Sequence, residues 1–133
     1  MSTTTTARVA DIMHAPPCSC GPEASLASAA RLMADHRIHA VIVAGLGESP
    51  GRPWGVVSAL DVAAAAAHRT DVPTAADAAA TEFLTIAPDA PVTEAARLMA
   101  EHDLNHLVVA DHEDEPLGVI STLDIARAYV HAH

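Results

Sequence analysis

The chain has 133 residues, of which 50% are hydrophobic and 2% aromatic, and its formal net charge is −10. This length suits one ordinary domain, whose core must consist of Val, Leu, Ile, Met and the many alanines, about 30 in number. The acidic, lysine-free composition argues against nucleic-acid binding, which depends on phosphate neutralisation, and no apolar run approaches the ~18 residues that a membrane span needs.

Two similar halves account for nearly the whole chain. Residues 29–34 (AARLMA) recur as residues 95–100 at an offset of 66, and residues 55–61 (GVVSALD) recur as residues 118–124 (GVISTLD) at an offset of 63. The first copy therefore carries three extra residues, which fall in the Gly- and Pro-rich loop 45–53. Repetition of this extent predicts two copies of one structural unit.

Each copy predicts the same elements in chain order. A short helical turn is followed by an extended segment, a helix of about a dozen residues, two β-branched strands and a final Ala-rich helix. The turns are 9–13 and 75–80, the extended segments 18–20 and 84–86, and the strands 41–43, 56–57, 107–109 and 119–120, with final helices from Ser58 and Ser121. Leu26, Ala29, Ala30 and Met33 recur at three- and four-residue spacing, which predicts the buried face of the first long helix.

The predicted fold class is therefore α/β (α+β), with two tandem β-α-β-β-α repeats. The first repeat spans residues 7–67, a linker spans 68–74 and the second repeat spans 75–131. The helices of one repeat cannot cover both faces of its three-stranded sheet. We therefore expect the two repeats to pack sheet to sheet with pseudo-twofold symmetry.

The most informative motif, Gly-h-h-Ser-x-Leu-Asp (h, apolar), lies where a strand ends and a helix begins in both copies. Backbone amides at a helix start suit an anion, which the hydroxyl of Ser58 or Ser121 can also bind. Asp61 or Asp124 can accept both hydroxyls of a ribose, as in dinucleotide-binding folds. The glycine lets a ligand approach the strand. The same Ser-x-x-Asp spacing also predicts a helix capping box, and one pair can serve both roles.

The duplicated unit resembles a pair of cystathionine-β-synthase (CBS) domains, the arrangement called a Bateman module. The matching segments are residues 9–13 (VADIM), residues 22–26 (PEASL), the two AARLM helices and the two Gly-h-h-Ser-x-x-Asp motifs. The resemblance implies a regulatory module for adenosine-containing ligands, with two clefts between the repeats. It also implies a homodimer that forms through helices, for which the Ala-rich segments 63–67 and 75–80 offer small faces.

The resemblance further implies which residues bind the ligand. In that family the motif Asp binds the ribose, the Ser or Thr lies close to the phosphate or the ribose, and the short strand of the other repeat packs on the adenine. One cleft would combine Ser58 and Asp61 with Thr85 and Ile86, and the other would combine Ser121 and Asp124 with Ser19 and Cys20.

The family also places Arg or His just before the second strand, often followed by Pro, to meet phosphate. This chain has His39-Ala40 and Asn105-His106 there, so His39 and His106 are further candidates. The regulatory ligand is expected among AMP, ADP, ATP, adenosine and S-adenosylmethionine. Because neither of these positions holds Arg and the chain has no Lys, a nucleoside, a monophosphate or an empty site suits the clefts better than ATP.

We expect a stand-alone cytoplasmic regulator of an unknown target protein, without enzymatic activity and without a required cofactor. The sequence has no nucleophile elbow and no Gly-rich phosphate loop, which argues against catalysis. It has no secretory signal pattern, and Cys18 and Cys20 are too close for a disulfide framework.

Two other functions remain open from the residues. In the first, the clefts are vestigial, Ser58 and Ser121 act only as helix caps, and the chain is a ligand-free interaction or scaffold dimer. In the second, Cys18, Cys20 and His14 form a metal- or redox-responsive site, although no metal-binding spacing supports a bound metal.

Overall fold

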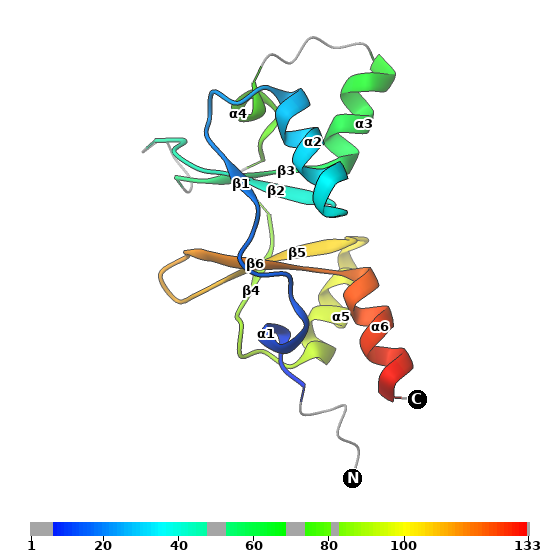
Figure 1. The fold of residues 1–133 in the computed structure, drawn as a ribbon. Helices are drawn as coiled ribbons and strands as arrows, with labels where there is room; N and C mark the ends of the chain where they lie inside the picture. The colour runs from blue at the N-terminus through cyan, green and yellow to red at the C-terminus, as the bar shows by residue number, and fades with distance from the viewer. Residues whose placement is uncertain (1–6, 48–52, 69–73, 81–82, 133) are drawn as a thin grey trace. The chain divides into compact units, whose positions relative to one another are not determined.

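The structure is a computed structural model that describes residues 7–47, 53–68, 74–80 and 83–132 (Figure 1). Residues 69–73 of the expected linker and residues 48–52 of the Gly- and Pro-rich loop lie outside the described residues. The chain forms two compact units: one contains residues 18–83, and the other combines the chain up to Pro17 with the chain from Leu84 onward.

The unit of residues 18–83 contains one sheet with the strand order β1-β2-β3, in which β1 is parallel and β3 antiparallel to β2. Its helices lie on one face of this sheet (Figure 1). The elements are β1 (Ser19–Cys20), α2 (Leu26–His36), β2 (Ala40–Val43), β3 (Gly55–Ser58), α3 (Ala59–His68) and α4 (Ala75–Ala78).

The second unit repeats this arrangement, with the strand order β4-β5-β6 and the same parallel and antiparallel pairs. Its elements are α1 (Val9–Ile12), β4 (Thr85–Ile86), α5 (Val92–His102), β5 (His106–Ala110), β6 (Pro116–Ser121) and α6 (Thr122–Ala132). Two three-stranded sheets with covering helices confirm the predicted α/β class and the β-α-β-β-α order. None of the described helices is long and apolar enough to cross a membrane.

Local chemistry marks the start of α2 and the ends of both long helices, α2 and α5. Ser25 caps α2 by accepting the backbone N–H of Ser28 at 3.0 Å, and α2 ends at Arg37 in the left-handed conformation. Asp103 follows the last residue of α5 and adopts the same left-handed conformation. Arg97 and Glu101 form an i,i+4 ion pair on the exposed face of α5, with 3.0 Å between their charged atoms.

One apolar core forms in each unit between the long helix and the sheet. In the first unit, Ala29 and Met33 of α2 pack with Val41, Val43 and Val57 of the sheet. In the second unit, Ala95 and Met99 of α5 pack with Leu107, Val109 and Ile120. The predicted helical face is thus the buried one, because small and unbranched residues let the helix approach the β-branched strands.

Each of the two short helices opens one sequence repeat but packs on the sheet of the other. Helix α1 opens the first repeat, yet Val9 is fully buried in the core of the second unit, and His14 exchanges two backbone hydrogen bonds with Val119 of β6. Helix α4 opens the second repeat, yet Ala75 is buried in the first unit, and Ala80 exchanges two backbone hydrogen bonds with Val56 of β3. The compact units therefore differ from the sequence repeats by this exchange of leading segments.

This exchange explains the glycine that opens each motif. A Cβ atom at Gly55 would lie 2.7 Å from the carbonyl oxygen of Ala80, and one at Gly118 would lie 2.5 Å from the carbonyl oxygen of His14. The space beside each glycine is filled by the chain itself. This corrects the expectation that the glycine leaves room for a ligand.

Candidate ligand-binding junctions

The first strand–helix junction joins β3 to α3 through Ser58 and Asp61. The Ser58 backbone N–H and hydroxyl donate to Asp61 Oδ2 at 2.8 and 2.9 Å, and the Asp61 backbone N–H donates to Ser58 Oγ at 3.2 Å. These reciprocal bonds form a capping box, because Ser58 precedes the first helical residue and Asp61 is the third. The junction is part-buried, so the carboxylate is held in place at the helix start.

The second junction, between β6 and α6, has the same geometry. Ser121 donates its backbone N–H and hydroxyl to Asp124 Oδ2 at 2.8 and 3.0 Å, and the Asp124 N–H donates to Ser121 Oγ at 3.2 Å. Both residues are buried, with 9% and 6% of their surfaces exposed. The capping prediction is therefore confirmed in both copies. In each carboxylate, these bonds use Oδ2 and do not use Oδ1.

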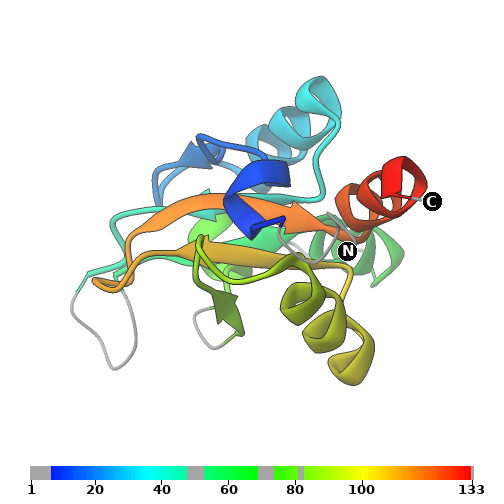
Figure 2. The same ribbon diagram turned by 90° about the horizontal axis from the view of Figure 1, so that it is seen from below.

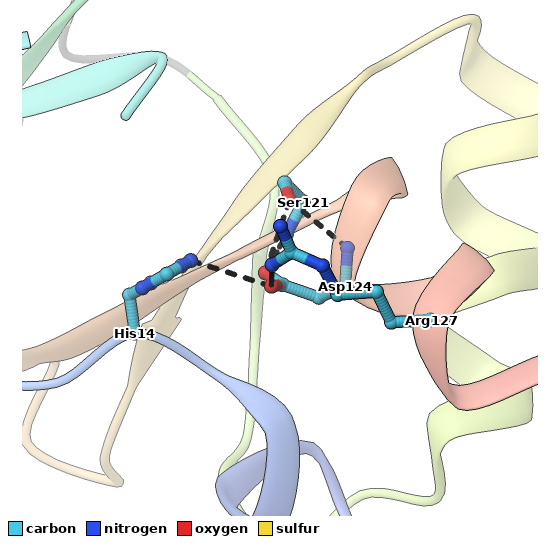
Figure 3. Close-up of polar contacts among 4 residues, drawn as sticks. All are labelled: His14, Ser121, Asp124 and Arg127. Carbon is cyan, nitrogen blue, oxygen red and sulfur yellow. Dashed lines mark hydrogen bonds and ion pairs between the residues drawn. The ribbon is translucent and has the colours of Figure 1, made fainter. Parts of the chain in front are cut away.

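At the second junction, two basic side chains approach the other carboxylate oxygen of Asp124. His14 Nε2 lies 3.3 Å and Arg127 Nη1 lies 4.0 Å from Asp124 Oδ1. Figure 3 shows them reaching Asp124 from two elements, the segment after α1 and the helix α6. Sequence reasoning assigned neither residue to this site. The i,i+3 spacing of Asp124 and Arg127 was a usable signal, whereas the approach of His14 requires the exchange of leading segments.

The two candidate histidines before the second strands lie beside the junctions. The His39 carbonyl oxygen accepts the N–H of Ala59, the first residue of α3, at 2.7 Å, and the Asn105 carbonyl oxygen accepts that of Thr122 at 2.9 Å. His106 is the direct cross-strand partner of Ser121, and its Nδ1 lies 3.0 Å from Asn105 Oδ1. Residues opposite each other on antiparallel strands share one face of the sheet, so His106 lies next to Ser121.

In each expected set, the candidates on the short strand belong to a different compact unit from the Ser–Asp pair. Thr85 and Ile86 lie in β4, which is not part of the unit that contains Asp61. Ser19 and Cys20 lie in β1, which is not part of the unit that contains Asp124. Their joint contact with a ligand stays a prediction. Ile86 is buried in the core of its own unit, and burial raises the pKa of the Cys20 thiol, which lowers its thiolate fraction near neutral pH.

The residues of the metal or redox hypothesis do not gather in the structure. Within the described ranges, no three His, Cys, Asp or Glu side chains are placed to hold a metal ion together. Cys18 and Cys20 are free thiols, and His14 contacts Asp124 instead.

Comparison with known proteins assigns the family. The CBS domain family matches residues 9–68 and 75–131, so the chain belongs to the CBS domain family. A protein of Acidianus ambivalens described as an uncharacterized 17.7 kDa protein in the bps2 3' region is 26% identical over 117 residues. That match covers 84% of this chain and 66% of the relative, so the chain spans just under two thirds of the relative's length.

Two solved structures share the fold over nearly the whole chain. The CBS domain protein PAE2072 from Pyrobaculum aerophilum, complexed with AMP, is 28% identical with a TM-score of 0.79 and covers 95% of this chain and 98% of its own. The CBS domain pair of protein MJ0100, in complex with 5-methylthioadenosine and S-adenosyl-L-methionine, is 23% identical with a TM-score of 0.83. That match covers 96% of this chain and 99% of the other.

Proposed function

We propose that this chain is a cytoplasmic, regulatory CBS domain pair that binds an adenosine-containing ligand and signals to a partner protein. The observation that carries the proposal is the pair of held carboxylates, Asp61 and Asp124, each fixed by its capping box at a strand–helix junction. Each presents a carboxylate oxygen that the capping bonds leave unused, and a ribose can donate its two hydroxyls to such a group. Relatives complexed with AMP, 5-methylthioadenosine and S-adenosyl-L-methionine support this ligand class.

The capping boxes and the ligand sites are compatible in this proposal. A carboxylate oxygen has two lone pairs, so the Ser–Asp bonds need not break when a ribose hydroxyl arrives. Preorganisation of Asp61 and Asp124 also lowers the ordering cost of binding. The scaffold alternative, in which Ser58 and Ser121 act only as caps, predicts that no adenosine-type ligand binds.

Substitution of the two carboxylates tests the proposal. With AMP, adenosine and S-adenosylmethionine as probes in titration calorimetry, we expect Asp61→Asn and Asp124→Asn each to weaken one binding event by about 10–100-fold, because a charged acceptor for hydrogen bonds is lost. The double variant is expected to bind none of the three.

Asp77→Asn is the matched control. Asp77 accepts the hydroxyl of the N-cap residue Thr74 at 2.9 Å and donates its N–H back to that hydroxyl at 3.3 Å, but it lies in the first turn of α4 and at no strand–helix junction. We expect this variant to bind like the wild type. Absence of heat with all three probes in the wild type, or equal losses in Asp77→Asn, contradicts the sensor and favours the scaffold.

We also propose that two copies of the chain form a homodimer through the helices α3 and α6. Large apolar side chains are exposed on them at Leu60, Leu123, Tyr129 and Val130, with exposed fractions between 50% and 74%. Of the two Ala-rich segments, the one in α3 exposes Ala63, Ala64, Ala66 and Ala67, whereas Ala75 of the other is buried inside its unit. Exposed apolar side chains gathered on helices are typical of interaction surfaces.

Substitutions that introduce negative charge on α3 and α6 test the dimer. Leu60 and Leu123 occupy equivalent positions of the two repeats, so a Leu60→Asp and Leu123→Asp double variant is expected to be monomeric by light scattering coupled to size exclusion. Thr93→Asp, at an exposed position of α5, adds a charge elsewhere and is expected to leave the mass unchanged. A wild type that is already monomeric at high concentration contradicts the proposal.

A further inference from the structure

We propose that the two junctions select ligands of different charge: the Asp124 junction takes an adenosine ligand with an anionic phosphate, bound by His14 and Arg127, and the Asp61 junction takes an uncharged nucleoside. This inference rests on the proposed function, because it assigns a ligand class to each of the same two sites. Its basis is the difference between two junctions that are otherwise alike in sequence and geometry.

The Asp124 junction gathers two basic groups on one carboxylate. Asp124 is 6% exposed, and its Oδ1 is approached by His14 Nε2 at 3.3 Å and by Arg127 Nη1 at 4.0 Å (Figure 3). The two side chains are themselves 51% and 63% exposed. They are therefore anchored to a buried acid at one end and open to solvent along their length, so that both can turn toward an arriving ligand.

The Asp61 junction has alanine at both corresponding positions. Ala80 pairs with Val56 of β3 through the same two backbone hydrogen bonds by which His14 pairs with Val119 of β6. Arg127 lies at an offset of 63 from Ala64 in α3, the offset that relates Asp124 to Asp61. Among the described residues, no basic side chain forms an ion pair with Asp61. The repeats therefore keep the carboxylate and the cap but differ in the charge around them.

A nucleotide suits the Asp124 junction for a chemical reason. A ribose that donates its hydroxyls to Asp124 Oδ1 competes with His14 and Arg127 for that oxygen and releases them. The phosphate of a nucleoside monophosphate is esterified to the same sugar, so it arrives within reach of the released groups. Arginine binds phosphate through paired N–H donors, and histidine adds a charge-assisted donor when protonated.

The acidic residues of the β5–β6 loop do not oppose the attraction of a phosphate to His14 and Arg127 at close range. His106 lies beside Ser121 as its cross-strand partner and adds a third nitrogen base to the junction. The acidic residues of the β5–β6 loop lie at the end of the hairpin opposite to the start of α6 (Figures 1 and 2). Within that loop, Asp111 Oδ1 accepts the backbone N–H groups of Glu113 and Glu115 at 2.8 and 3.0 Å, which holds that carboxylate in its own turn.

At the Asp61 junction, no basic side chain of the described residues pairs with the carboxylate, which repels a phosphate and accepts ribose hydroxyls. An uncharged nucleoside satisfies such a site without bringing a second negative charge near it. The two junctions of one chain can then report two different ligands.

Calorimetry with AMP and adenosine tests the assignment one junction at a time. In an Asp61→Asn background, which leaves the Asp124 junction, we expect AMP to bind at least about tenfold more tightly than adenosine, and the added His14→Ala and Arg127→Ala substitutions to remove this preference. In an Asp124→Asn background we expect adenosine to be preferred. In the same Asp124→Asn background, the added substitutions Ala80→His and Ala64→Arg are expected to shift the preference toward AMP.

Arg31→Ala controls for the loss of one positive charge, because Arg31 is exposed on α2 and lies at neither junction. It is expected to keep the AMP preference of the Asp61→Asn background. If AMP, adenosine and S-adenosylmethionine all fail to bind the wild type, the proposed function fails and the inference fails with it; if S-adenosylmethionine alone binds, only the inference is wrong. If both ligands bind but the AMP preference survives in the His14→Ala and Arg127→Ala variant, the inference is wrong while the proposed function stands.

Discussion

Replacing Gly118 with alanine is expected to lower the free energy of unfolding by about 1–3 kcal/mol, the usual cost of forcing a methyl group into packed structure. The new Cβ atom would lie 2.5 Å from the His14 carbonyl oxygen and 2.9 Å from the Met13 sulfur. The sulfur can move, but the carbonyl is backbone and is held by its hydrogen bond from the Val119 N–H at 3.0 Å. Relief of the clash therefore requires the segment after α1 to leave β6.

Gly21→Ala is the matched control for this substitution. A Cβ at Gly21 has nothing within 4 Å, so the change is expected to leave stability nearly the same or to raise it slightly through the unfolded state. Urea titration followed by circular dichroism measures both variants. Equal stability of Gly118→Ala and the wild type would show that the segment after α1 does not pack on β6. Because His14 moves with this segment, Gly118→Ala is also expected to weaken AMP binding at the Asp124 junction.

Val9→Asp is expected to unfold the second unit, with a loss of several kcal/mol, because it places an unpaired charge in an apolar core. Val9 is fully buried among residues of α5, β5 and β6, more than 70 positions away in the sequence. Its backbone N–H donates to the Ala90 carbonyl oxygen at 2.9 Å, which fixes α1 against the start of α5. The damage should therefore appear in the second repeat, although the substitution lies in the first.

Hydrogen exchange with mass spectrometry locates the effect. We expect protection to be lost in β4–β6 and α5, and to be kept better in β1–β3. Ala10→Asp is the control, since it adds the same charge to the same short helix at an exposed position and is expected to change little. Loss of protection confined to β1–β3 would mean that α1 packs on its own repeat, contrary to the structure.

The elements of this fold were readable from the sequence because their signals are local. Three- and four-residue spacing of apolar residues marked the buried face that Ala29 and Met33 form in α2. β-branched runs marked the central strands, and the Ser-x-x-Asp spacing marked the caps that Ser58–Asp61 and Ser121–Asp124 form. Each signal depends on residues at most a few positions apart, so the chain needs no distant contact to display it.

The sequence by itself determined the duplication, the order of elements, the family and the two carboxylates at the strand–helix junctions. Only the tertiary structure decided that the leading segments exchange repeats, that Gly55 and Gly118 accommodate those segments, and that His14 joins Asp124 while Ala80 takes the matching place beside β3. The physical reason is that these contacts join residues tens of positions apart through backbone hydrogen bonds and steric fit. Such contacts leave no periodic pattern in the chain, whereas helices, strands and caps do.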